Sequence, residues 1–374
     1  MSLERGLAAP PPVFLSVHGG PDAGPPIRHD FSTNANPLPP LPLLMERLAR
    51  ADRTRYPDPT YAALTEALSQ HHGVHARRVL PTAGSSEGIR RLTLAAAQRG
   101  RRQVWIPEPG YGDYRAAALA LSLPVRTWNE PSALLEGLRR EPAAALVWIT
   151  EPCNPTGGTL PELFWRELAA LADQQGAWLA LDRAYEPLRL QGQDPVPAAV
   201  AQQCWQLFSP NKSLGLTGVR AGYMLAPLQA GLANTNLLLA LAASWVVSAE
   251  GEALLRALPL PEVQGWLADS RLRLIDWRVK QAALLAELGW AQRQSVVPFW
   301  LARPPVPSAA LGRCLQQLRE QGIKLRDAQS FGLQGWVRLS TQHPEAQAAL
   351  AEGWRAHMAR PGAQWSTSTI QSTF

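Results

Sequence analysis

The stretch Ser209-Pro-Asn-Lys-Ser-Leu-Gly-Leu-Thr-Gly-Val-Arg-Ala-Gly-Tyr223 places one lysine, Lys212, in a polar loop between two apolar runs. The runs Cys-Trp-Gln-Leu-Phe (204–208) and Ala-Gly-Tyr-Met-Leu-Ala (221–226) are each predicted to form a short buried strand. Burial and the nearby charge of Arg220 both lower the pKa of an amine, which makes it nucleophilic. The setting favours Schiff-base chemistry at Lys212, with Ser209 and Arg220 suited to bind an anion. The alternative is a surface loop with an ordinary lysine.

Length and composition indicate a large globular protein. The 374 residues predict one α/β unit with a smaller second domain, and 46% hydrophobic with 18% charged residues excludes a disordered chain. The net charge is +6, and the arginines are scattered through the expected helices, which we interpret as a solvated surface with a modest bias towards anionic substrates. No helix-turn-helix or RNA-binding motif is found, so nucleic-acid binding is not expected.

The cysteines and apolar runs indicate the compartment. Three widely spaced cysteines, Cys153, Cys204 and Cys314, do not have the spacing of a metal site, so no metal is expected. With no disulfide framework or metal site indicated, a reducing cytosol is the default expectation. No signal peptide and no run of 18 apolar residues is found, so neither export nor a membrane span is expected. We therefore expect a cytoplasmic protein.

The order of predicted elements indicates the fold class. Strands and helices alternate between residues 79 and 226, and residues 144–150 form a continuous apolar run typical of a buried parallel strand. This pattern predicts an α/β fold, with a mostly parallel central sheet flanked by helices and with ligands at the carboxyl ends of the strands. Residues 229–289 are expected to be helical with a break at 244–247, and the remainder to mix strands and helices as a smaller α+β domain. The expected divisions are an N-terminal arm (1–45) that contributes to the small domain and the active site, a large domain (46–240), a small domain (241–360) and a tail (361–374).

Two predicted turns follow strands and carry polar residues. Gly84, Ser85 and Ser86 lie where a strand passes into a helix, and helix N-termini attract anions. The alternative is a simple helix cap. Asn154 follows the apolar run 144–150, and its amide is suited to donate to a phenolic oxygen. The alternative is a proline-rich turn that is stabilised by its asparagine.

Three further side chains are candidates for contacts with a flat ring. Asp182 ends the run Ala-Trp-Leu-Ala-Leu, where a buried carboxylate is costly unless it is paired, for example with a protonated pyridine nitrogen. Its alternative is a cap on the next segment. Tyr185 can reach the same ring oxygen as Asn154, and Tyr111 offers an aromatic face for stacking, or is an ordinary loop residue. An amine, an anion site, a carboxylate, an amide and a stacking face together predict pyridoxal 5′-phosphate (PLP).

With Tyr56 in Arg-Tyr-Pro, the residues Asn154, Asp182, Lys212 and Arg220 resemble the PLP-dependent class I/II aminotransferase family of fold type I, over about residues 17–358. The resemblance implies roles for individual residues. Lys212 would bond to the cofactor, Asp182 would pair with its ring nitrogen, and Asn154 and Tyr185 would contact its 3-oxygen. The phosphate would be held by Ser85, Ser209 and Arg220, and by Tyr56 from a second subunit, which implies a homodimer with shared active sites. Arg338 would bind a substrate carboxylate.

Within the family, the motifs His18-Gly-Gly, Asp30-Phe-Ser-Thr-Asn-Ala-Asn-Pro-Leu and Lys324-Leu-Arg-Asp-Ala resemble the L-threonine O-3-phosphate decarboxylases of cobalamin biosynthesis. Histidinol-phosphate aminotransferases, which use 2-oxoglutarate, share the Asn-x-Asn-Pro and Arg-Tyr-Pro elements and are the alternative. Either resemblance implies a small anionic substrate. The implied substrate contacts are His18, Gly19, Asn36, Asn154, Arg326 and Arg338.

This chain departs from the family at one position, and two other classes of protein are weighed against it. Asn211 precedes the lysine, where the family usually has serine or threonine. A non-catalytic regulator with the same fold is a remote alternative, because such proteins usually carry an added DNA-binding segment and none is found. A NAD-linked enzyme is disfavoured because no strand-linked Gly-x-Gly-x-x-Gly is present.

Overall fold

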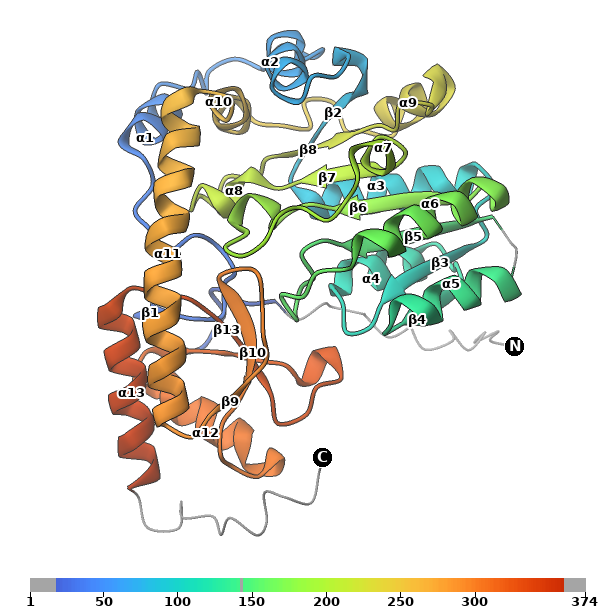
Figure 1. The fold of residues 1–374 in the computed structure, drawn as a ribbon. Coiled ribbons are helices and arrows are strands. Elements are labelled where there is room, and N and C mark those ends of the chain that lie inside the picture. Colours follow the sequence, from blue (N-terminus) through green and yellow to red (C-terminus); the bar gives the residue numbers. More distant parts are fainter. Residues whose placement is uncertain (1–17, 142–143, 360–374) are drawn as a thin grey trace, which may run out of the picture.

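The computed structural model describes residues 18–141 and 144–359, and Figure 1 shows them as two units joined by a long helix. The larger unit is built on a seven-stranded sheet in the order β2-β8-β7-β6-β5-β3-β4. All neighbouring strands are parallel except that β8 is antiparallel to β2 and to β7. This confirms the predicted mostly parallel α/β sheet. The strands are β2 (Val79–Thr82), β3 (Gln103–Pro107), β4 (Val125–Trp128), β5 (Ala145–Thr150), β6 (Trp178–Asp182), β7 (Trp205–Phe208) and β8 (Gly222–Leu225).

Helices cover both faces of this sheet, which explains why β5 is apolar throughout. Val147 and Ile149 of β5 pack against α5 (Pro131–Arg140) and α6 (Glu162–Gln175), with α7 (Ala198–Ala201) beside them. Leu146 and Trp148 point the other way, towards α3 (Ser85–Gln98), α4 (Gly112–Ala120) and α9 (Gly231–Ala240). Successive side chains of a strand face opposite sides, so a sheet that is covered on both faces needs apolar residues at every position.

Two local predictions need correction. Lys212 does not lie in an open loop, because Pro210–Ser213 forms the short helix α8 between β7 and β8. Proline occupies the first turn of α8, where its missing N–H is tolerated. The helix α5 was not predicted at all, although Leu134, Leu135 and Leu138 mark its buried face. The strand β4 ends just before α5 and is short and partly exposed, so the sequence shows no clear boundary at which a new helix begins.

A third layer packs against β2 and β8, at the end of the sheet where β2 is the edge strand. It contains α1 (Pro42–Ala49), α2 (Ala62–His72), the 3-10 turn η1 (Ala76–Arg78), α10 (Ala249–Ala257) and the first turns of α11 (Pro261–Glu287). The helix α11 then continues into the smaller unit, where Leu285 joins the second unit's apolar core. The chain therefore passes between the units within α11, and Figure 1 shows this helix beside both. The exact domain limits stay a prediction.

The smaller unit consists of short strands and two helices. Its sheet has the antiparallel order β12-β13-β10-β9, and a separate parallel pair joins β1 to β11. The elements are β1 (His29–Asp30), β9 (Ala291–Gln292), β10 (Phe299–Arg303), α12 (Ser308–Glu320), β11 (Ile323–Lys324), β12 (Arg326–Asp327), η3 (Gln329–Phe331), β13 (Val337–Ser340) and α13 (Pro344–Met358). Through β1 and the buried Phe31, residues 29–31 belong to this unit although they precede α1 in the chain. Within the described ranges, no helix is both long and apolar enough to cross a membrane.

Candidate active site

A cavity of about 360 Å³ lies at the carboxyl ends of the parallel strands, between the two units. Both units contribute to its wall, as expected for a site at strand ends. Most of the residues predicted from the sequence meet here. The lining residues are His18, Gly19, Ser32, Thr33, Asn34, Ser85, Ser86, Tyr111, Gly112, Asn154, Tyr185, Asn211, Lys212, Thr217, Arg220, Arg326, Phe331 and Arg338.

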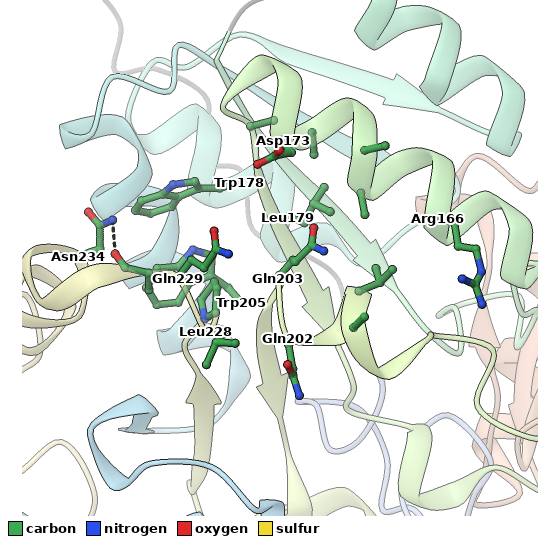
Figure 2. Close-up of a pocket in the computed structure, with 18 residues that line it drawn as sticks. Arg166, Asp173, Trp178, Leu179, Gln202, Gln203, Trp205, Leu228, Gln229 and Asn234 are labelled. Atoms are coloured by element: carbon green, nitrogen blue, oxygen red, sulfur yellow. Dashed lines mark hydrogen bonds between the residues drawn. The ribbon is translucent and has the colours of Figure 1, made fainter.

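A larger cavity of about 630 Å³ lies at the other end of the sheet and is shown in Figure 2. It is lined by Trp178 and Trp205, which begin β6 and β7, and by Leu228 and glutamines. Among the described residues, its wall includes none of the side chains predicted for the site. Its few charged groups, such as Arg166 and Asp173, are not grouped around a nucleophile. The smaller cavity is therefore the candidate active site.

Lys212 is held on α8 at the floor of the cavity. Burial lowers the pKa of its amine, the cation Arg220 lowers it further, and the Asp182 carboxylate opposes both effects. The Lys212 Nζ lies 5.6 Å from the centre of the Tyr185 ring. A lysine with a lowered pKa spends more time as the free amine, which is the form that attacks a carbonyl.

Asp182 is the last residue of β6 and is only 3% exposed. Its Oδ2 accepts a hydrogen bond of 2.7 Å from the Tyr114 hydroxyl, and its Oδ1 accepts one of 2.9 Å from the Ala184 amide. Burial raises the pKa of Asp182, while the Lys212 amine and these two donors oppose the rise. The Ala184 contact is the capping contact that was the alternative for Asp182. Tyr114 was missed by sequence reasoning, although it lies on α4 three residues after Tyr111 and faces the sheet.

Tyr111 is fixed in the cavity wall by its hydroxyl. This group donates to Asp113 Oδ2 at 2.9 Å and lies 3.2 Å from Ser86 Oγ. Burial raises the pKa of Tyr111, so the ring stays a neutral phenol. His18 approaches from the N-terminal segment, with its ring centre 5.8 Å from that of Tyr111 and its Nε2 3.7 Å from Asp113 Oδ1. Asp113 is a second contact that the sequence did not reveal.

Asn154 and Arg338 are joined across the two units. Arg338 donates from Nη1 to Asn154 Oδ1 and from Nη2 to the Ser32 carbonyl, each at 2.7 Å. Asn34 also donates to Asn154 Oδ1, at 3.4 Å. This assigned orientation leaves the Asn154 Nδ2 as the donor available to a ligand. Burial lowers the pKa of Arg338 to about 10, so it remains a cation at neutral pH, and burial raises the pKa of Tyr185 to about 12.

Two arginines stand directly opposite each other on the small sheet. Arg326 of β12 and Arg338 of β13 are register partners, and both line the cavity. The Phe331 ring lies between them, with its centre 4.9 Å from the Arg326 guanidinium carbon and 5.8 Å from that of Arg338. Like charges directly opposite on a sheet are destabilising. An anion bound between them would offset that repulsion.

The start of α3 and the lysine segment form a second cationic wall. Gly84 has φ +81°, and a Cβ placed there would lie 2.7 Å from Arg220 Nη2. Only glycine lets the guanidinium approach the helix start. On the lysine segment, the Ser209 Oγ is buried and has no hydrogen-bond partner among the described residues. The helix N-terminus, the guanidinium and the unpartnered hydroxyl fit the phosphate of PLP.

Ser85 and Ser86 are the first helical residues of α3 and not its cap. The cap position is Gly84, which makes no side-chain capping bond. The capping-box alternative is therefore not observed. Both serines line the cavity with their backbone amides among the free N–H groups of the first turn.

The structure does not bring every predicted residue to this cavity. Asn36 is 3% exposed and lies outside the described lining, because its amide donates to the Ser213 carbonyl and accepts from the Leu38 amide, each at 3.1 Å. These bonds hold Asn36 against α8, so the structure does not support a direct contact between Asn36 and the substrate. Tyr56 is 76% exposed, stacks on Trp245 with ring centres 4.1 Å apart, and also lies outside the described lining.

Asn211, the departure from the family pattern, lines the cavity beside Lys212. Its Nδ2 donates to the carbonyls of Val219 at 3.2 Å and Thr217 at 3.5 Å. The amide donor is thus engaged with the turn that carries Arg220. Asn211 therefore ties that turn to α8. Its amide makes this structural contact at the position where the family's usual serine or threonine would offer a hydroxyl.

Comparison with known proteins agrees with this geometry. The family model for "Aminotransferase class I and II" matches residues 27–351. The histidinol-phosphate aminotransferase of Ruegeria sp. (strain TM1040) is 32% identical over 335 residues, which are 86% of this chain and 88% of that protein. The threonine-phosphate decarboxylase of Salmonella typhimurium is 31% identical over 246 residues, or 59% of this chain and 65% of that protein.

A solved structure supports the fold assignment. Histidinol-phosphate aminotransferase from Sinorhizobium meliloti, solved in complex with pyridoxal 5′-phosphate, superposes with a TM-score of 0.73 at 20% identity, and the match covers 88% of this chain and 92% of that one. The predicted fold type is confirmed. With a family model that spans most of its length, the chain belongs to the class I and II aminotransferase family.

Proposed function

We propose that this chain is a PLP-dependent enzyme that decarboxylates a small phosphorylated amino acid, L-threonine O-3-phosphate. One observation carries the proposal: the cross-strand pair Arg326 and Arg338 faces the same cavity as Lys212. A short substrate with a carboxylate and a phosphate supplies one anion for each arginine. The decarboxylase-like motifs around His18 and Arg326 support the same substrate.

Several of the residues that would hold PLP line the cavity with Lys212. The phosphate would be held at the start of α3, by Ser209 and by Arg220. Asn154 and Tyr185 are suited to the ring 3-oxygen, and Tyr111 to the ring face. When bound, PLP accepts the electrons of the substrate bond that breaks. Asp182, held by Tyr114 and Ala184, is suited to stabilise positive charge at the ring nitrogen.

Lys212 has two tasks in this proposal. Its amine would hold the cofactor at its carbonyl carbon, and the same amine would be placed to move a proton at the substrate's reacting carbon. Burial lowers the pKa of Lys212, which increases the fraction of free amine that can accept a proton. A positioned acid or base of this kind typically contributes ~10²–10⁴-fold in rate.

The substrate's pose selects which bond breaks, and the arginines set the pose. A cavity of about 360 Å³ is near the lower end of the ~300–1,000 Å³ usual for ligand sites, which favours a short substrate beside the cofactor. A short dianion that is clamped at both ends has few poses. By holding both anions, Arg326 and Arg338 would fix the orientation of the substrate carboxylate, and this orientation would favour loss of carbon dioxide over loss of the α-proton.

Amino transfer from histidinol phosphate to 2-oxoglutarate is the second candidate, and the comparison with relatives favours it. The histidinol-phosphate aminotransferase match covers 88% of that protein, whereas the decarboxylase match covers 65% of its own. Histidinol phosphate has no carboxylate, so one arginine would be left for 2-oxoglutarate in the second half-reaction. The two arginines would then bind anions of different substrates in successive half-reactions, and not two anions of one substrate.

The proposal includes a homodimer in which Tyr56 completes the neighbouring site. Tyr56 and Trp245 form an exposed stacked aromatic pair, and exposed aromatic side chains are typical anchors of protein interfaces. Tyr56 lies outside the described lining of its own chain's cavity, which is consistent with a contact made in the partner.

Product analysis distinguishes the two reactions. The PLP-loaded protein is incubated with L-threonine O-3-phosphate, and separately with histidinol phosphate plus 2-oxoglutarate. Release of carbon dioxide and an amino-alcohol phosphate from the first mixture, with little glutamate from the second, is expected. Rapid glutamate formation without carbon dioxide would overturn the decarboxylase assignment in favour of the aminotransferase.

A further inference from the structure

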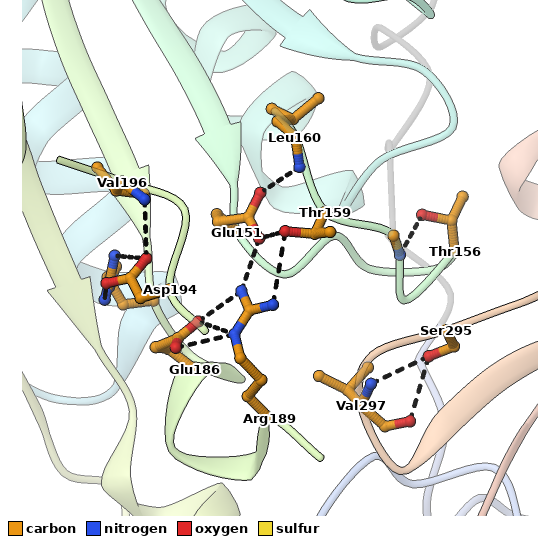
Figure 3. Close-up of polar contacts among 12 residues, drawn as sticks. Glu151, Thr156, Thr159, Leu160, Glu186, Arg189, Asp194, Val196, Ser295 and Val297 are labelled. Atoms are coloured by element: carbon orange, nitrogen blue, oxygen red, sulfur yellow. Dashed lines mark hydrogen bonds and ion pairs between the residues drawn. The ribbon is translucent and has the colours of Figure 1, made fainter. Parts of the chain in front are cut away.

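A buried ionic cluster lies on the chain segments next to Asn154 and Tyr185 of the candidate active site, and Figure 3 shows its side chains. Arg189 donates from Nη2 to Glu151 Oε1 and to Glu186 Oε2, each at 2.8 Å, and its Nε contacts both Glu186 oxygens at 3.0 Å. Glu151 also accepts from the Thr159 hydroxyl and, at 2.9 Å, from the Leu160 amide. The Glu151 side chain is fully buried, and that of Arg189 is 6% exposed.

Each carboxylate of this cluster lies next to a predicted cofactor contact in the chain. Glu151 precedes Asn154 by three residues, in the turn that follows β5. Glu186 follows Tyr185 directly and begins the 3-10 turn η2 (Glu186–Leu188). Arg189 therefore ties together the two segments that carry Asn154 and Tyr185.

The same two segments also hold part of the smaller unit. The Val296 amide donates to the Gly157 carbonyl at 2.8 Å, and the Val296 carbonyl accepts from the Leu190 amide at 2.7 Å. Residues 295–297 thus lie between the Asn154 turn and the segment after η2. They lead into β10, which pairs with β13, the strand of Arg338. The contact is tight, because a Cβ on Gly157 would lie 1.9 Å from Ser295 Oγ.

A buried ion cluster is poor evidence for stability alone. The cost of taking charges out of water is large, and well-packed apolar residues often serve the fold equally well. What a planar guanidinium adds is geometry, because its fixed fork of donors binds two carboxylates at defined positions. A cluster that joins two segments of the site is therefore suited to set their spacing.

We propose that Arg189 is a positioning residue that fixes Asn154 and Tyr185 relative to each other, so that both reach the same ring oxygen of PLP. This inference rests on the proposed function, because it takes from it the cofactor roles of Asn154 and Tyr185. Arg189 acts only through these two residues and through the 295–297 segment. It lies outside the described lining of the cavity and so has no contact there with substrate.

The experiment compares PLP binding in two variants with wild type. Arg189→Lys keeps the charge but loses the planar fork, and Glu151→Gln with Arg189→Met removes the buried pair together, which avoids leaving an unpaired Glu151 charge. Apoprotein is titrated with PLP, and the absorption maximum of the bound cofactor is recorded at one pH. The double variant is expected to bind PLP about tenfold more weakly with a displaced maximum, as is typical when a residue that orients a ligating group is lost. Arg189→Lys should show a smaller change in the same direction.

Arg101→Met is the matched control. Unlike Arg189, Arg101 donates to backbone carbonyls, including that of Gly176 at 3.1 Å, and it lies over the Trp178 ring at the opposite end of the sheet. This variant should bind PLP as wild type does, even where its apoprotein melts earlier. A decrease in PLP affinity that follows melting temperature equally in all variants would overturn the proposal.

The outcomes separate the inference from the function on which it rests. Wild type that binds no PLP would refute the proposed function itself. Wild type that binds PLP while both Arg189 variants keep its affinity and absorption maximum would overturn only the positioning role. Should the double variant fail to fold, Arg189→Lys alone decides, and a wild-type spectrum and affinity in it would overturn the proposal.

Discussion

Replacing Gly84 by alanine tests the phosphate site through backbone geometry alone. Gly84 has φ 81° and ψ 174°, a region that residues other than glycine rarely occupy at a cost of ~1–3 kcal/mol. The new Cβ would also lie 2.7 Å from Arg220 Nη2, so the guanidinium must move away from the helix start. Two effects are therefore expected: a less stable apoprotein and a weaker phosphate site.

The size of the second effect follows from the contact that is lost. A hydrogen bond to a charged group is typically worth ~1.5–3 kcal/mol, which corresponds to roughly 10- to 150-fold in affinity. We expect Gly84→Ala to weaken PLP binding within this range. The affinity is measured by titrating apoprotein with PLP, and the free energy of unfolding of the apoprotein by urea denaturation.

Gly73→Ala is the matched control for backbone strain. Gly73 follows α2 with φ 61° and ψ 36°, and no described atom lies within 4 Å of its hypothetical Cβ. Its replacement should destabilise the fold by ~1–2 kcal/mol without changing PLP affinity. The decisive step repeats Gly84→Ala in an Arg220→Ala background, where most of its effect on affinity should vanish. An equal loss in both backgrounds, or wild-type affinity in Gly84→Ala, would refute the reasoning.

Three substitutions test the other roles. Lys212→Ala should lose the borohydride-sensitive visible band and turnover while its circular dichroism spectrum stays native, because one side chain on α8 is removed; full activity would contradict the role of Lys212. Asp182→Asn should retain PLP but lose much more than about threefold in kcat, because an amide cannot stabilise the ring's charge as a carboxylate does; a smaller loss would leave Asp182 as a cap only. Tyr56→Phe should increase PLP loss on dialysis of a dimer, whereas a monomer that retains PLP normally would exclude the intersubunit contact.

The parts of the site that sequence reasoning found are those fixed by short stretches of chain. Asp182 ends a buried strand, and Asn154 and Lys212 each follow a strand within a few residues. Because parallel strands end at one edge of the sheet, knowing the strands was enough to predict that these side chains meet. Their common location is observed, while their chemical roles stay predictions.

The contacts that were missed depend on how distant segments pack. Tyr114 reaches Asp182 across 68 residues of sequence, and nothing in the residues around either one announces the contact. Arg189 reaches Glu151 across 38 residues in the same way. Asn36 shows the opposite case, because its motif resembled a substrate contact while the fold uses its amide to brace α8. The local sequence pattern predicts a helix or strand and the residue where it ends. Which distant side chains contact each other depends on tertiary packing.

The cross-strand arginines depend on both local sequence and tertiary packing. Each was singled out separately from its own motif, but their register on β12 and β13 appears only in the folded chain. Arg326 bonds to the Ser330 hydroxyl, and Arg338 bonds to Asn154 and the Ser32 carbonyl, and these bonds help to fix the direction of both guanidinium groups. Opposed cations in a half-closed cavity are a cost to the fold. An anionic ligand removes that cost, which is why the pair supports a substrate with anions at both ends.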